Sequence, residues 1–215
     1  MRIRSNPVRP ERGRLAAESK DAIPTLAELR AARLPLAWFA RDTAVVARAL
    51  LGCALVHGAR AGIIVETEAY LGPTDLASHA RFGRTARNAV MFGAAGVSYV
   101  YLCYGVHEMF NIVARAEAEA EAGAVLVRAV APLRGLPDDA AVGRGPGKLT
   151  RALGLSRGQH GRTLDGDQLF VAGWQSARAA AIARGPRIGV DYAGAWAPRP
   201  LRFTIAGHPA VSGRR

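Results

Sequence analysis

The chain has 215 residues, of which 50% are apolar and 21% charged. It is long enough for one packed domain or two small ones, and its composition excludes wholesale disorder. The 29 Lys and Arg outnumber the 17 Asp and Glu, for a formal net charge of +12. This excess favours a polyanionic partner, and biased amino-acid usage is the alternative. Only Lys20 and Lys148 are lysines, and arginine is the side chain that grips phosphate with two parallel bonds.

The chain alternates short predicted strands with short predicted helices, without long regular crossovers. Helices are expected at 24–32, at 42–51, around 77–79 and at 148–153. Strands are expected at 53–57, 63–70, 97–104, 109–114, 124–131, 168–173, 187–192 and 201–206. The first two strands, separated by Gly-Ala-Arg-Ala-Gly, predict a hairpin. The pattern indicates an α+β fold, a single domain with a curved, mainly antiparallel sheet and surrounding short helices.

Two charged segments stand apart from this pattern. Residues 1–20 carry six basic and two acidic side chains, so we expect a flexible basic tail ahead of one domain over 21–215. The alternating Ala-Glu run at 116–121 is acidic and small. We expect it to form a solvated loop or frayed helix that faces away from any polyanion.

Cysteine and histidine usage argues against disulfides and metals. Cys53 and Cys103 are the only cysteines, each among apolar residues, so we expect buried, reduced thiols and a cytoplasmic protein. His107-Glu108 begins like a zinc-binding HExxH motif, but Asn111 stands where the second histidine belongs. We therefore expect no metal site. No apolar run reaches the 18 or so residues that span a bilayer, so no membrane partner is expected.

The strand at 63–70 carries the first candidate site. Period-2 alternation places Glu66, Glu68 and Tyr70 on one face. A carboxylate at the end of an apolar strand, beside an aromatic ring, suits a general base. The simpler interpretation of this strand alone is that both glutamates lie on a solvated face.

A second candidate is a cluster of tyrosines. Tyr99 and Tyr101 share one face of a predicted strand, and Tyr104 lies at the following turn, close to His107 and Asn111. Three tyrosines within six residues could stack on nucleic-acid bases. An aromatic strand is more often plain core.

The glycine-rich segment at 143–150, GRGPGKLT, invites comparison with a phosphate loop. It fails the Walker pattern, because Val142 stands in place of the first glycine and Leu149 in place of the Ser or Thr after the lysine. A glycine-rich turn that enters a helix still binds one phosphate through its amides, with Lys148 beside it. The segment thus disfavours nucleotide hydrolysis and suits a backbone phosphate contact.

Taken together, these segments resemble the alkyladenine (3-methyladenine) DNA glycosylase family. The matching residues run in order from about 35 to 210: ETEAYLGP (66–73), Asp75, ASH (77–79), GRT (83–85), RN (87–88), MF (91–92), YVY (99–101), YG (104–105), NI (111–112), VLVRA (125–129), GPGKL (145–149), RIG (187–189), AW (195–196) and PLRF (200–203). The resemblance implies an enzyme that flips a damaged purine nucleotide out of duplex DNA and hydrolyses its N-glycosidic bond.

The resemblance also implies roles for the two candidate clusters. Glu68 aligns with the catalytic glutamate that activates a water, and Glu66 on the same face is the competing carboxylate. Tyr70, His79 and Tyr101 align with the residues that sandwich the flipped base. Electron-rich rings attract a cationic alkylated purine by roughly 0.5–2 kcal/mol per good contact.

Other positions align with DNA contacts. Tyr104 matches the wedge that fills the gap left by the extruded base. Asn111 matches the position that crowds the 2-amino group of guanine. Arg128 aligns with a pocket residue near the phosphate of the target nucleotide. Arg84 and Lys148 are candidate contacts to the DNA backbone.

The sequence also bears on the type of reaction. A glycosylase that also cleaves the strand needs an amine, and the chain offers only Lys20, Lys148 and its N-terminus. We therefore expect a monofunctional enzyme that uses a water and leaves an abasic site. We also expect it to be monomeric and to need no cofactor. The alternative is a non-catalytic nucleic-acid-binding module in which Glu68 does no chemistry. The ranking of 3-methyladenine, 7-methylguanine, hypoxanthine and ethenoadenine as substrates stays open.

Overall fold

The structure of the protein is a computed structural model, which describes residues 23–116, 122–174 and 181–213. Its α-helices are α1 (Leu26–Ala31), α2 (Thr43–Ala49) and α3 (Pro146–Leu153). Its strands are β1 (Ala54–His57), β2 (Arg60–Tyr70), β3 (Ser98–Cys103), β4 (His107–Val113), β5 (Ala124–Arg134), β6 (Leu169–Ala172), β7 (Ile182–Gly185) and β8 (Arg202–Ile205). Short 3-10 helices lie at η1 (Leu36–Phe39), η2 (His79–Phe82), η3 (Ala89–Phe92), η4 (Arg157–Gln159) and η6 (Asp191–Trp196).

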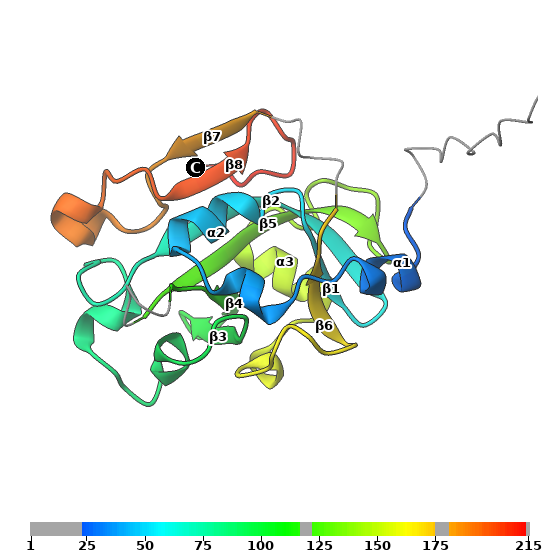
Figure 1. The fold of residues 1–215 in the computed structure, drawn as a ribbon. Coiled ribbons are helices and arrows are strands. Elements are labelled where there is room, and N and C mark those ends of the chain that lie inside the picture. The colour runs from blue at the N-terminus through cyan, green and yellow to red at the C-terminus, as the bar shows by residue number, and fades with distance from the viewer. Residues whose placement is uncertain (1–22, 117–121, 175–180, 214–215) are drawn as a thin grey trace, which may run out of the picture.

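Strand β2 is the centre of the sheet (Figure 1). The strands follow the order β3-β4-β5-β2-β1-β6, and β8 joins the far end of β2 with β7 outside it. Each of these pairings is antiparallel. The sheet curls, and short helices surround it, so the expected α+β fold with a curved antiparallel sheet is confirmed. Because β2 has neighbours on both sides, its residues from Ala61 to Ala69 are all buried.

Local sequence signals account for the helices. Thr25 and Glu28 form a reciprocal capping box at the start of α1. Asp42 caps α2 by accepting the amide N–H of Val45 at 2.8 Å, as its predicted position at the helix start implied. Helix α3 begins at Pro146 and ends before Gly154, whose left-handed backbone closes the helix.

The two faces of β2 are covered differently. Thr67 points to the α2 side, where its hydroxyl donates to the Ala47 carbonyl at 2.8 Å. Glu66 and Glu68 point the other way, as the predicted alternation requires. Apolar side chains from the sheet and from the surrounding helices make one large buried core, with Phe39, Phe110 and Phe170 among its largest members.

The pairing of β2 with β5 is irregular beside the glutamates. Glu66 lies opposite Ala129 and Thr67 opposite Val127, so Arg128 has no partner residue on β2. Arg128 is therefore the extra residue of a β-bulge, a feature that re-aims side chains near functional sites. The bulge turns this arginine toward the two glutamates.

Several predicted boundaries are wrong. Strand β2 begins at Arg60, three residues early, because Gly58 takes a left-handed backbone and closes a tighter hairpin turn. Of the segment expected as a helix around 77–79, only His79 is helical: it begins the 3-10 helix η2, which Ser78 caps by accepting the Ala80 N–H. Strand β5 continues to Arg134 because β2 pairs with it throughout.

The strand expected at 187–192 does not form, and the chain there turns into η6. Gly189 takes a positive φ of 75°, which breaks extended pairing. The expected tail at 1–20 and most of the Ala-Glu run at 116–121 lie outside the described residues. In the part of the chain that is described, no helix is long and apolar enough to cross a membrane.

Candidate active site

A cavity of about 670 Å³ opens on the face of the sheet that carries Glu66 and Glu68. Its walls come from β2, β5, the β3–β4 hairpin, the start of α3, and the segments around His79 and Ile188. Seven of the nine residues that the sequence singled out line it: Tyr70, His79, Tyr101, Tyr104, Asn111, Arg128 and Lys148. The volume falls in the range of about 300–1,000 Å³ usual for small-molecule sites.

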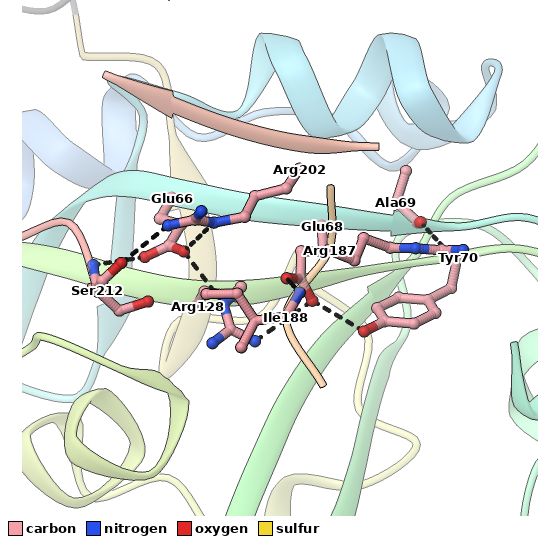
Figure 2. A network of polar contacts seen from close by, with 9 residues as sticks. All are labelled: Glu66, Glu68, Ala69, Tyr70, Arg128, Arg187, Ile188, Arg202 and Ser212. Atoms are coloured by element: carbon pink, nitrogen blue, oxygen red, sulfur yellow. Dashed lines mark hydrogen bonds and ion pairs between the residues drawn. The ribbon is translucent and has the colours of Figure 1, made fainter. Parts of the chain in front are cut away.

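Glu68 lies directly behind the cavity wall, with none of its surface exposed. Its Oε2 accepts the Tyr70 hydroxyl at 2.8 Å and Arg128 Nη1 at 3.3 Å, and its Oε1 accepts the Ile188 amide N–H at 2.7 Å (Figure 2). All three donors belong to residues that line the cavity. The carboxylate is therefore held in place by three donors from the cavity wall.

Glu66 is also fully buried, so the interpretation of a solvated face is wrong. Its Oε1 accepts Arg128 Nε at 3.2 Å and Arg202 Nε at 2.6 Å, and its Oε2 accepts the Ser212 amide N–H at 2.7 Å (Figure 2). Arg128 thus binds both glutamates. Burial lowers the pKa of Arg128, but Glu68 and Glu66 outweigh it and raise the pKa above its ordinary value.

Aromatic rings form one wall of the cavity. The ring centroids of His79 and Tyr101 are 4.6 Å apart, and those of Tyr99 and Tyr101 are 5.3 Å apart. Burial raises the pKa of Tyr99 to about 12, and burial raises that of Tyr101 as well. These hydroxyls therefore stay protonated at neutral pH.

His79 is held uncharged beside these rings. It shares a 2.8 Å hydrogen bond between its Nδ1 and the Tyr99 hydroxyl. Burial, together with Arg87 and Arg81, lowers the pKa of His79 to about 4. The imidazole is therefore a neutral wall at physiological pH.

Tyr70 completes the aromatic lining next to Glu68. Burial, with the negative charge of Glu68, holds the pKa of Tyr70 well above its ordinary value. Its hydroxyl is consequently a permanent donor to the carboxylate.

The β3–β4 hairpin supplies two further site residues. Asn111 is buried, and its Nδ2 donates to the carbonyls of Tyr99 and Met109 at 3.0 and 3.1 Å. Tyr104 at the hairpin tip is 94% exposed and takes a left-handed φ of 50°. A non-glycine residue with this backbone is uncommon and carries strain. The hairpin therefore holds one buried polar side chain and one exposed aromatic ring in the cavity lining.

The cavity lining is positively charged. Among the described residues it contains Arg87, Arg128 and Lys148, and it contains no Asp or Glu. Lys148 is exposed at the start of α3, whereas Arg84 is exposed but outside the cavity. Sequence reasoning missed Arg87, whose guanidinium lies 5.3 Å from the centroid of the Tyr101 ring. Only its place in the matching RN segment marked it.

The two cysteines occupy different environments and are not joined by a disulfide. Cys53 is buried in the core, as expected. Cys103 is only half-buried, because the last residue of β3 reaches the cavity wall. In the parts of the chain described, no three His, Cys, Asp or Glu side chains converge on a possible metal position.

Comparison with known proteins gives the site its context. A family model described as "Methylpurine-DNA glycosylase (MPG)" matches residues 37–209. A protein of Myxococcus xanthus (strain DK1622) is 50% identical over 183 residues, which are 83% of this chain and 93% of that protein. A protein of Legionella pneumophila (strain Corby) is 42% identical over 184 residues, which are 84% of this chain and 98% of that protein. Both bear the name "Putative 3-methyladenine DNA glycosylase". This chain is accordingly a DNA glycosylase that hydrolyses the N-glycosidic bonds of alkylated bases, and it belongs to the methylpurine-DNA glycosylase family.

Proposed function

We propose that this enzyme flips alkylated and deaminated purine nucleotides out of duplex DNA, and that Glu68 activates the water that releases the base. We also propose that it acts in the cytoplasm as a monomer and without a cofactor. The proposal rests on one observation above all. A fully buried carboxylate meets three donors at the wall of a cavity large enough for a purine nucleotide. The product of the proposed reaction is DNA with an abasic site.

The hydrogen bonds of Glu68 suggest where the water binds. An ionised carboxylate offers about four acceptor positions. Oε2 takes two donors and Oε1 takes one among the described residues. The remaining position is on Oε1, so a water that donates there is held next to Ile188, at the cavity wall. Glu68 then accepts a proton from the water as its oxygen bonds to the sugar carbon C1′, while the C1′–N bond breaks and its electron pair leaves with the base.

The base is proposed to enter between Tyr70, His79 and Tyr101. Bases in a duplex stack cannot reach a buried carboxylate, so extrusion is required, at a cost of a few kcal/mol that is smallest for weakly paired lesions. A neutral His79 and two protonated tyrosines present rings that carry no charge of their own. Asn111, held by two carbonyls, then crowds the 2-amino group of a normal guanine.

The surroundings of the cavity are proposed to bind the duplex. Tyr104 projects its ring into the gap left by the extruded base, because its exposed position leaves the ring free to enter the minor groove. Lys148 at the start of α3 and Arg84 neutralise phosphates of the DNA backbone. Arg128 lies in the base pocket, near the phosphate of the target nucleotide, and its charge is already paired with Glu66 and Glu68. These contacts provide affinity for duplex DNA, and the aromatic rings provide selectivity for the damaged base.

Base release from a defined duplex tests the proposal. Duplexes that each carry one 7-methylguanine or one hypoxanthine are incubated with the enzyme, and abasic sites are revealed by strand cleavage in hot alkali. We expect single-turnover release by the wild type, and a loss of at least 100-fold in Glu68→Gln with DNA affinity kept within a few-fold. Release by Glu68→Gln at the wild-type rate would refute the role of Glu68 and favour a binding role for the cluster.

Lys148 requires a separate test, because it lines the cavity and carries an amine. A lyase would form a Schiff base between an amine and the sugar. We expect borohydride to trap no covalent enzyme–DNA complex, and the product strand to stay intact without alkali. A trapped complex that disappears in Lys148→Met would show a lyase instead.

A further inference from the structure

The ion pair between Asp75 and Arg187 lies outside the catalytic scheme described above. Arg187 Nη1 and Nη2 contact Asp75 Oδ2 and Oδ1 at 2.6 and 2.8 Å, and both side chains have no exposed surface. The two residues are 112 positions apart and do not line the cavity in the described part of the chain. Burying two charges is costly, and such a pair is weak evidence of a role in stability alone.

Both partners also contact the segments that surround Glu68. Arg187 Nη1 donates to the Ala69 carbonyl at 2.8 Å, and the guanidinium lies 4.7 Å from the centroid of the Tyr70 ring (Figure 2). The next residue, Ile188, donates its amide N–H to Glu68 Oε1. Arg187 therefore binds β2 at Ala69, the residue after Glu68, and directly precedes Ile188, whose N–H is a donor to the Glu68 carboxylate.

Asp75 shapes the segment that leaves β2. Its Oδ2 accepts the Leu71 N–H and its Oδ1 accepts the Ala77 N–H, both at 3.0 Å. These bonds hold the turn between Tyr70 and His79. The ion pair thus joins this turn to the segment of Ile188, and both segments contribute residues to the cavity wall.

One further detail separates this pair from a purely structural contact. Arg187 Nε is buried and has no hydrogen-bond partner among the described residues. Unsatisfied buried donors are rare in proteins and require a reason. The reason here is that Asp75, the Ala69 carbonyl and the Tyr70 ring together fix the position of the guanidinium. In that position Nε meets no acceptor among the described residues.

We propose that Asp75 and Arg187 are positioning residues for the glycosylase reaction. They set two of the three donors on Glu68, the Tyr70 hydroxyl and the Ile188 N–H, and so orient the carboxylate toward the water. The inference rests on the proposed role of Glu68. It predicts that breaking the pair slows base release and leaves DNA binding unchanged.

The test compares Asp75→Asn and Arg187→Lys with the wild type. Asp75→Asn keeps the shape and removes the charge, whereas Arg187→Lys keeps the charge and removes the two-pronged contact. The measurements are the single-turnover rate of base release from a 7-methylguanine duplex and the Kd for a duplex with a tetrahydrofuran abasic analogue. We expect the rate to fall at least tenfold and Kd to change less than twofold. The double variant is expected to be no slower than the slower single variant, because the two residues act as a unit.

Thr67→Val is the matched control. It removes a buried hydrogen bond from the same strand, on the face away from Glu68, so it reports loss of stability without loss of positioning. We expect its rate to stay within twofold of the wild type at a temperature below all melting transitions. If Asp75→Asn does not fold, Arg187→Lys alone decides the question.

Two outcomes have distinct meanings. Wild-type rates in folded Asp75→Asn or Arg187→Lys, with Glu68→Gln inactive, would overturn the positioning inference and leave the proposed function standing. A wild-type rate in Glu68→Gln would overturn the proposed function itself. A parallel loss of rate and affinity in Asp75→Asn and Arg187→Lys would also overturn positioning, because it would show that the pair maintains the fold as a whole and does not act on base release alone.

Discussion

Tyr70 donates its hydroxyl to Glu68 at 2.8 Å from two positions further along the same strand. The contact follows from strand geometry, because residues i and i+2 share a face. It joins the proposed base-binding wall to the proposed catalytic carboxylate.

Replacement of Tyr70 by Phe keeps the ring and removes this donor. A hydrogen bond to a charged group is worth about 1.5–3 kcal/mol, so we expect single-turnover base release to slow by roughly tenfold or more. Tyr192→Phe is the control, since Tyr192 is an exposed residue whose hydroxyl contacts the Ala77 carbonyl at 3.5 Å rather than Glu68. Equal rates in Tyr70→Phe and Tyr192→Phe would contradict the role of the Tyr70 hydroxyl.

Replacement of Glu66 by Gln is expected to affect stability before chemistry. It leaves Arg128 and Arg202 without their shared carboxylate. Breaking a buried ion pair costs roughly 3–5 kcal/mol, which lowers Tm by roughly 10 °C in a protein of this size. Thermal melting measures the loss, with Glu28→Gln on the surface as a control of small effect. Below its melting range, Glu66→Gln should release the damaged nucleobase faster than Glu68→Gln. The reverse order would make Glu66 the better candidate for the carboxylate that accepts the proton of the water.

His79 is expected to make stability depend on pH. Its folded-state pKa of about 4 lies below its ordinary value of 6.5. The unfolded chain therefore takes up the proton first, and stability falls as pH drops from about 6.5 toward 4. Melting curves at pH 7.5 and pH 5 should show a larger loss of Tm in the wild type than in His79→Gln. His208, whose pKa is also lowered by burial, is present in both proteins and cancels. An equal loss in the two proteins would show that His79 does not contribute.

Arg87 is expected to bias the choice of lesion. Its guanidinium lies against the Tyr101 ring and places a positive charge at the cavity wall. Arg87→Ala removes repulsion toward a cationic purine and frees the ring, an effect of about 0.5–2 kcal/mol. The ratio of rates for 7-methylguanine over hypoxanthine should rise by about threefold or more. Using the ratio removes any uniform loss from a weakened phosphate contact, and an unchanged ratio would limit Arg87 to such a contact.

The sequence predicts much of the sheet and of the site. The β1–β2 hairpin and the shared face of Glu66, Glu68 and Tyr70 follow from alternation along one strand. The alternation of residues along β2 does not tell whether that face meets water or protein. Burial of the two glutamates depends on β5 and β8, whose residues lie more than 50 positions away.

The segment at 187–192 shows where local patterns fail. Ile188 and Val190 alternate with small or polar residues as a strand would. In the fold the Ile188 N–H is bonded to the Glu68 carboxylate rather than to a neighbouring strand, and Gly189 reverses the backbone. The Ile188 N–H, which would bond to a neighbouring strand in a ladder, thus donates to the Glu68 side chain of β2 instead. The same long-range dependence hid the pairing of Asp75 with Arg187.

The β-bulge at Arg128 separates the architecture of this enzyme from its chemistry. The backbone ladder between β2 and β5 closes on either side of this position without a partner for it. A substitution at Arg128 would therefore change the charge that faces the two glutamates without removing a partner from the ladder. The electrostatic environment of Glu66 and Glu68 and the register of the sheet thus depend on different residues of β5.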